Sequence, residues 1–161
     1  MNKVFLLIGG NIGDRMANLA MAVEFIEKYL GKIFQISSIY ETAAWGNTHQ
    51  ADFLNQAICI ETSLSPNDLM TQILLIEQKM GRERNIPLGP RTIDIDILYY
   101  NDAIVENEQV TIPHPRISER KFVLYPLVEI APDWIHPSLH KTNTALLKEC
   151  GDSLAVHKKT P

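Results

Sequence analysis

The chain has 161 residues, of which 45% are hydrophobic and 21% charged, and its formal net charge at pH 7 is −4. This composition is that of a soluble globular protein and excludes a disordered or membrane chain. The acidic balance argues against nucleic-acid binding in general. No apolar run reaches the roughly 18 residues of a membrane span. We therefore expect one domain over residues 1–161 with no membrane or nucleic-acid partner. A cytoplasmic location and a monomeric state are further expectations.

The N-terminal segment predicts a strand followed by a helix. Residues 4–8 form a continuous apolar run that ends at Gly9 and Gly10, which is typical of a buried central strand and a tight turn. Apolar residues then recur at helical spacing, with Asp14 placed to cap the helix start and Gly31 to end it. The turn resembles phosphate-binding loops only weakly, because it lacks their glycine spacing.

The next segments continue an alternation of strands and helices. Residues 33–40 and 53–61 have strand patterns, and we expect these strands to be neighbours. Ser65 and Pro66 are a strong helix opening, and the helix is expected to run to Met80. The two cysteines, in the second of these strands and near the chain end, form neither a metal cluster nor a disulfide framework, which favours a reducing compartment.

Residues 92–100 predict the last main strand, so that the element order is strand, helix, strand, strand, helix, strand. This order is that of an α+β, ferredoxin-like antiparallel sheet with helices on one face. The remaining third predicts an elaboration of short elements. Strands are expected near 103–105 and 109–112, and a frayed tail over 157–161. A helix interrupted by Pro126 is expected over 122–130, and a last short helix over 144–150.

Two carboxylates occupy the strand that the isoleucines of residues 93–97 predict to be buried. Strand side chains alternate, so Asp94 and Asp96 point to the same face, about 6.6 Å apart along the backbone. Two hard-oxygen ligands on a rigid element suit Mg²⁺. The alternatives are that both acids are salt-bridged to nearby arginines, or are exposed on a half-solvated sheet.

Three guanidinium groups precede these acids, on Arg82, Arg84 and Arg91. Guanidinium groups match phosphate oxygens in geometry and charge, so a metal–polyphosphate site explains the acids and the arginines together. A helix-dipole role is the alternative for the first two. A second basic cluster is expected around His114, although a lone histidine in a proline-rich loop is more often structural.

A further hypothesis is a site in which aromatic side chains stack on a heterocycle and an amide hydrogen-bonds to its edge. The residues of this site are Thr42, Trp45, Phe53, Asn55 and Phe122. Taken singly, each of these aromatic residues is more readily explained as part of the hydrophobic core. Asn11, in the first turn, is also a candidate ligand contact.

With these motifs, the chain resembles the 6-hydroxymethyl-7,8-dihydropterin pyrophosphokinase family of folate biosynthesis over about residues 4–132. Several ordered motifs carry the resemblance: Gly9-Gly10-Asn11-Ile12-Gly13, Tyr40-Glu41-Thr42, Asp52-Phe53-Leu54-Asn55-Gln56-Ala57, Gly89-Pro90-Arg91-Thr92-Ile93-Asp94-Ile95-Asp96-Ile97-Leu98, Pro113-His114-Pro115-Arg116, and Arg120-Lys121-Phe122-Val123-Leu124-Tyr125-Pro126-Leu127.

The resemblance implies transfer of pyrophosphate from ATP to the pterin hydroxymethyl oxygen, with release of AMP. It implies that Asp94 and Asp96 hold two Mg²⁺ ions and that Arg82 and Arg91 clamp phosphates as catalytic residues. The implied ATP-binding positions are Glu77, Arg82, Arg84, Arg91, Ile97, Thr111, His114 and Arg120. The implied pterin-binding positions are Thr42, Ala43, Trp45, Phe53, Asn55 and Phe122.

Other functions fit the same fold class. An RNA-recognition module fits poorly, because it needs exposed aromatics and a basic sheet face. A nucleotide sensor would bind ATP without turnover. A two-metal phosphohydrolase would release phosphate without a pterin acceptor.

Overall fold

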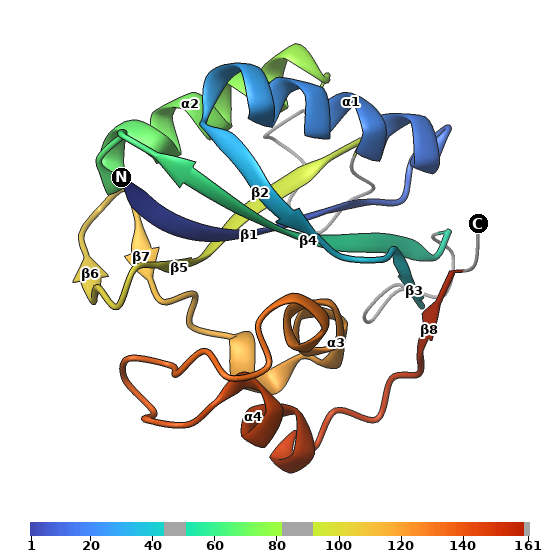
Figure 1. Cartoon of the computed structure of the whole chain (residues 1–161). Helices are drawn as coiled ribbons and strands as arrows, with labels where there is room; N and C mark the ends of the chain where they lie inside the picture. The colour runs from blue at the N-terminus through green and yellow to red at the C-terminus, as the bar shows by residue number, and fades with distance from the viewer. Residues whose placement is uncertain (44–50, 82–91, 160–161) are drawn as a thin grey trace.

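The computed structural model describes residues 1–43, 51–81 and 92–159. Its centre is a six-stranded sheet in the strand order β5-β1-β4-β3-β8, with β2 paired to β4 beside this path (Figure 1). All the pairings in this sheet are antiparallel. Its strands are β1 Asn2–Gly10, β2 Lys32–Ile36, β3 Tyr40–Thr42, β4 Phe53–Thr62, β5 Asp94–Tyr100 and β8 Val156–Lys158. A separate two-stranded sheet pairs β6 Val105–Glu106 with β7 Thr111–Ile112.

Helices cover both faces of the main sheet. Figure 1 shows α1 and α2 on one face and α3 and α4 on the other. Their bounds are α1 Arg15–Tyr29, α2 Pro66–Lys79, α3 Lys121–Ile130 and α4 Asn143–Glu149, and a short 3₁₀ helix, η1, spans Ile117–Glu119. The predicted α+β fold, with an antiparallel sheet and two helices on one face, is therefore confirmed, and the C-terminal elaboration supplies the helices of the second face. None of the helices in the described ranges is long and apolar enough to span a membrane.

Local signals explain where the first two helices begin. The side chain of Asp14 accepts a hydrogen bond from the backbone N–H of Ala17, at 3.0 Å, and caps α1 as predicted. The side chain of Ser65 accepts one from the N–H of Asp68 and caps α2. Both caps satisfy backbone donors that have no partner inside the helix.

Each face of the sheet has its own hydrophobic core. In β1, Leu6 belongs to the core shared with α1 and α2, whereas Phe5 and Leu7 belong to the core shared with α3 and α4. Burial on both faces explains why residues 4–8 are apolar without interruption, since an alternating pattern is expected only where one face meets water.

One predicted strand is divided in the structure. The strand expected over residues 33–40 is two strands, β2 and β3, which pair with different parts of β4. Ser37 lies between them, where its Oγ accepts the backbone N–H of Ala57 at 2.9 Å and holds the chain against β4 across the break. Side-chain hydrogen bonds of this kind leave no hydrophobic period in the sequence, which is why the break was missed.

The tail expected to be frayed is ordered over part of its length. Residues 156–158 form β8, which pairs with β3, and the N–H of Lys159 donates to the carbonyl of Ile39 at 2.7 Å. This pairing covers the edge that β3 would otherwise expose. A three-residue strand of mixed polarity carries too little pattern to be recognised in the sequence.

Candidate functional site

The two predicted metal ligands lie on an edge strand and face the α3 side of the sheet. In β5, Asp94 pairs with Gly9 and Asp96 with Leu7 of β1. Leu98, the next residue with the same orientation, packs in the core beside α3, whereas the isoleucines at 93, 95 and 97 pack in the core beside α1 and α2. The predicted alternation is thus confirmed. Both aspartates are partly exposed, so their face of the strand is accessible to a ligand.

Glu77 lies on the opposite side of the sheet from these aspartates. It is 4% exposed, on α2, and its Oε2 accepts the backbone N–H of Ile95 at 2.9 Å. Because β5 is an edge strand, its outward N–H groups need partners from outside the sheet. This buried carboxylate provides one and holds the strand between the two aspartates in place. An ATP contact for Glu77 stays a prediction.

His114 anchors the segment after β7 to the end of β5. Its backbone N–H donates to the carbonyl of Leu98 at 3.0 Å, and its Nδ1 accepts the N–H of Arg116 at 3.1 Å. Burial lowers the pKa of His114 to about 4, and the charges of Arg120 and Arg116 contribute to this shift. The ring is therefore neutral at pH 7 and carries its proton on Nε2, as a hydrogen-bond donor. The expected basic cluster is thus built by the arginines without a charge on His114.

Arg120 connects this segment to the aspartates. Burial lowers the pKa of Arg120, and Arg116 lowers it further, whereas the negative charge of Asp96 raises it. The guanidinium carbon also lies 5.5 Å from the centre of the Phe122 ring, in the range of a cation–π contact. Arg120 therefore contacts the Phe122 ring and lies within electrostatic range of Asp96.

The predicted pterin residues of β3 and β4 lie on the same face as the aspartates. Thr42 pairs with Phe53, and Tyr40 with Asn55. Asn55 also pairs with Gly9, which in turn pairs with Asp94. Directly paired residues point to the same face, so the row from Asn55 through Gly9 to Asp94 crosses three strands, β4, β1 and β5, from the aromatic side to the acidic side.

The remaining pterin candidates differ in exposure. Thr42 is 3% exposed and Asn55 is 5% exposed. Ala43 is exposed, and Phe122 lies in the first turn of α3, partly buried against the second core. The candidates therefore include two buried polar residues, Thr42 and Asn55, and two residues that are more accessible, Ala43 and Phe122.

Gly9 has a role that its place in the sequence does not reveal. The predicted tight turn at Gly9 and Gly10 is wrong, because both residues lie within β1. A Cβ atom at Gly9 would clash with Oδ1 of Asn55 and would lie 2.8 Å from the carbonyl oxygen of Leu54. The missing side chain therefore allows the Asn55 amide to lie over β1, toward the aspartates.

Asn11, a candidate ligand contact, is 5% exposed, and its Nδ2 donates to the carbonyl of Ala51 at 3.0 Å. It thus braces the chain that leads into β4, and a ligand contact for it stays a prediction. Four further candidates, Trp45, Arg82, Arg84 and Arg91, lie outside the described residues.

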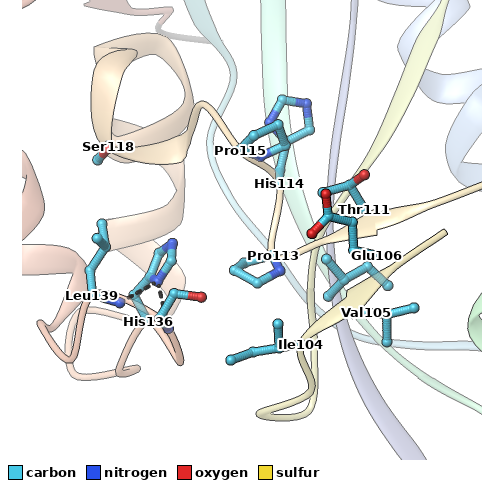
Figure 2. Close-up of a pocket in the computed structure, with 12 residues that line it drawn as sticks. Ile104, Val105, Glu106, Thr111, Pro113, His114, Pro115, Ser118, His136 and Leu139 are labelled. Carbon is cyan, nitrogen blue, oxygen red and sulfur yellow. Dashed lines mark hydrogen bonds between the residues drawn. The ribbon is translucent and has the colours of Figure 1, made fainter.

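A pocket of about 280 Å³ borders the predicted nucleotide residues. Figure 2 shows His136 and Leu139 on one side and Ile104, Val105 and Thr111 on the other, with Pro113 between them. Thr111 and His114 are both part of its lining. The pocket therefore places these two ATP candidates beside one cavity, whereas Ile97 is buried in the core beside α1 and α2.

Sequence reasoning missed one polar cluster on the α3 face. The hydroxyl of Tyr40 donates to Oε1 of Glu129 at 2.6 Å, and Oε2 of Glu129 accepts the backbone N–H of Ser38 at 2.8 Å. Burial and the neighbouring carboxylate raise the pKa of Tyr40, which therefore stays protonated. This cluster ties α3, which carries Phe122, to β3, which carries Thr42. Its members are too far apart in the chain for spacing to reveal them.

The donor set fits a divalent cation that shares its coordination with a substrate. Among the described residues, no group of three or more acidic, histidine or cysteine side chains could hold a metal ion by itself. Mg²⁺ is commonly bound through one or two carboxylates, with substrate phosphates and water as its other ligands. The pair Asp94 and Asp96, with Arg120 nearby, matches this chemistry.

Comparison with known proteins identifies the family of this chain. The model of the family 7,8-dihydro-6-hydroxymethylpterin-pyrophosphokinase (HPPK) matches residues 5–132. The chain is 42% identical over 141 residues to the 2-amino-4-hydroxy-6-hydroxymethyldihydropteridine pyrophosphokinase of Aquifex aeolicus, which covers 88% of each chain. It is 46% identical over 136 residues to the protein of the same name from Methylorubrum extorquens, which covers 84% of this chain and 86% of the other.

A solved structure supports the fold. The crystal structure of Plasmodium falciparum HPPK-DHPS with pterin and p-hydroxybenzoate superposes with a TM-score of 0.76 at 20% identity, over 92% of this chain and 43% of that one. The present chain thus spans less than half of that longer protein, and the likeness concerns the fold. Taken with the family match and the sequence relatives, the chain belongs to the HPPK family, the pyrophosphokinases of folate biosynthesis.

Proposed function

We propose that this chain transfers the pyrophosphoryl group of ATP to the hydroxymethyl oxygen of 6-hydroxymethyl-7,8-dihydropterin and releases AMP. One observation carries the proposal: the acidic pair of β5 and the aromatic–amide pair of β4 lie on the same face of one sheet, connected through Gly9. A phosphate-binding end and a heterocycle-binding end on one rigid surface are what a transfer between two bound substrates requires. The names of the relatives in Aquifex and Methylorubrum point to the same reaction.

At the acidic end, Asp94 and Asp96 would hold two Mg²⁺ ions together with the triphosphate. Bound there, the ions would neutralise negative charge on the phosphate oxygens. Arg82 and Arg91 would clamp the phosphates, as the resemblance implies. Arg120, which is within electrostatic reach of Asp96, would add positive charge on the side of α3.

For the nucleotide, we propose contacts from Glu77, Arg84, Ile97, Thr111 and His114. Support is strongest for Thr111 and His114, because both line the pocket beside β7. The neutral His114 ring can donate a hydrogen bond from Nε2 without adding charge.

At the other end, the pterin ring would lie between Phe53 and Phe122, and the amide of Asn55 would bind its polar edge. Backbone groups of residues 42, 43 and 45 would complete these contacts. Aromatic faces and an amide are suited to a flat heterocycle with donors and acceptors around its rim. The chain's own contribution to the transfer is positioning and charge stabilisation, and we assign no general base.

Residues 1–161 would form one pyrophosphokinase domain, which acts as a monomer in the cytoplasm with no nucleic-acid or membrane partner. The C-terminal strand β8 supports a single domain, since it pairs with β3 of the main sheet. The thiols of Cys59 and Cys150 are free, which fits a reducing compartment.

The test is to incubate the purified protein with Mg²⁺, ATP and 6-hydroxymethyl-7,8-dihydropterin and to separate the nucleotide products. AMP that forms only with the pterin, in step with a pyrophosphorylated pterin, is the expected result. ADP or free phosphate that forms without pterin would refute the proposal in favour of a kinase or phosphohydrolase. Binding of ATP without products would refute it in favour of a sensor.

A further inference from the structure

Arg15 links the two described ends of the chain that flank residues 44–50. Its Nη1 donates to Oε2 of Glu41 at 2.5 Å and to the backbone carbonyl of Asp52 at 2.8 Å. Glu41 is the middle residue of β3, and Asp52 immediately precedes β4. One guanidinium nitrogen therefore connects β3, through Glu41, to the residue that precedes β4.

This link lies next to the proposed pterin residues. Thr42 follows Glu41, Phe53 follows Asp52, and these two residues form the last pair of the β3–β4 ladder. No further ladder pair beyond Thr42 and Phe53 is present in the described part of these strands. The terminal pair of a ladder frays most easily, so an additional tie across it has the largest effect on its geometry.

Arg15 acts from the opposite face of the sheet. Glu41 pairs with Leu54, which belongs to the core beside α1 and α2, whereas Thr42 and Phe53 alternate to the α3 face. The guanidinium therefore approaches from the helix side, away from the face on which a pterin would bind. Its effect on a ligand must pass through the backbone of β3 and β4.

The support of Arg15 is itself rigid. Arg15 is the first residue of α1, directly after the cap Asp14. Asn18, one turn on, donates from its backbone N–H to the carbonyl of Asp14 and from Nδ2 to the carbonyl of Ile12, both at 2.9 Å. The start of the helix is thus fixed on both sides of Arg15, and the side chain transmits that position to β3 and β4.

The ion pair between Arg15 and Glu41 is partly shielded from solvent and keeps Glu41 charged. The side chains of Arg15 and Glu41 are 26% and 29% exposed, so solvent screens them only in part. The hydrogen bond from Arg15 lowers the pKa of Glu41, with a smaller contribution from the charge of Lys159. The ammonium of Lys159 lies 4.0 Å from Oε1 of Glu41, on the C-terminal segment that follows β8. Glu41 is therefore ionised at neutral pH and available to Arg15.

We propose that Arg15 is a positioning residue for the pterin end of the site: it holds Glu41 and Asp52 together so that the Thr42–Phe53 pair is preorganised for the heterocycle. The inference rests on the proposed function, because it deepens the assignment of that pair. Without the tie, the pair samples additional conformations in the free protein, and binding must then order it. The loss of affinity is confined to the pterin, because the acidic end of the site lies on β5, on the far side of β1 from β4.

The test is equilibrium binding with the Arg15→Ala variant, in saturating Mg²⁺ and α,β-methylene-ATP. The Kd for 6-hydroxymethyl-7,8-dihydropterin should rise about tenfold, the size expected for one charge-assisted hydrogen bond. The Kd for α,β-methylene-ATP itself should change less than about twofold. A milder variant, Glu41→Gln, keeps an acceptor for Arg15 and should raise the pterin Kd by a smaller factor. It preserves the test if Arg15→Ala does not fold.

The matched control is Lys141→Ala, which removes the exposed ion pair of Lys141 and Glu149, 2.9 Å apart, beside α4. It should leave both Kd values unchanged. An unchanged pterin Kd in Arg15→Ala would overturn the inference, and so would an equal rise for both ligands. The unmodified protein distinguishes failure of this inference from failure of the proposed function: if it does not bind the pterin at all, the proposed function fails, whatever the variants do.

Discussion

Replacing Gly9 with alanine tests the packing at the centre of the proposed site. The added Cβ would clash with Oδ1 of Asn55 and would lie 2.8 Å from the backbone carbonyl of Leu54. The side-chain amide could rotate away, but the carbonyl belongs to the neighbouring strand and can move only if β1 and β4 separate. Overpacking of this kind costs about 1–3 kcal/mol of unfolding free energy.

For a protein of this length, that cost corresponds to a fall in Tm of about 2–12 °C. Displacement of the Asn55 amide should also weaken pterin binding more than ATP binding, because Asn55 lies at the pterin end of the row. Thermal unfolding followed by circular dichroism measures the first effect, and titration of each ligand measures the second.

Gly151→Ala is the matched control, since a Cβ at Gly151 has no atom within 4 Å and that residue has no positive φ. It should leave Tm and both affinities near those of the unmodified protein. If Gly9→Ala behaved like this control, the close approach of Asn55 to β1 would be refuted, and with it the connection between the two ends of the site.

Three further predictions follow from the site. Asp96→Asn should lower the rate of AMP formation in Mg²⁺ by roughly two orders of magnitude or more while leaving Tm unchanged, because the isoleucines of β5 still pack; normal turnover would contradict the metal assignment. Phe122→Ala should raise the Kd for the pterin far more than that for ATP, and an equal loss of both in parallel titrations would argue against a stacked ring. His114, whose pKa is about 4 when folded, should contribute stability that is full above its unfolded pKa and is lost as the pH falls toward that folded value. His114→Gln should therefore flatten the fall in unfolding free energy between about pH 6.5 and pH 4 in urea titrations, and an unchanged slope would contradict the half-buried, neutral ring.

The two helical faces have different relations to the proposed chemistry. The face with α1 and α2 supplies supports, such as Glu77 beneath β5 and Arg15 at the start of α1. The face with α3 carries the groups proposed to meet the substrates, among them Asp94, Asn55 and Phe122. Because the residues that brace the strands lie on the α1 and α2 face, the opposite face can carry polar residues for substrates while the hydrophobic core beside α1 and α2 stays intact.

The sequence by itself determined the local features. The caps at Asp14 and Ser65 depend on residues within one helical turn, and the common direction of Asp94 and Asp96 depends only on strand alternation. Motifs that span several segments also sufficed to identify the family, because their order along the chain is specific.

Only the tertiary structure decided the contacts between distant segments. The clearance of Asn55 over Gly9, the β8–β3 pairing and the tie from Arg15 to Asp52 each join residues far apart in the chain. The neutral state of His114 likewise depends on burial and on the arginines around it. Such contacts have no period in the sequence, since they arise only when separately formed elements pack together and each polar group must find a partner or remain in water.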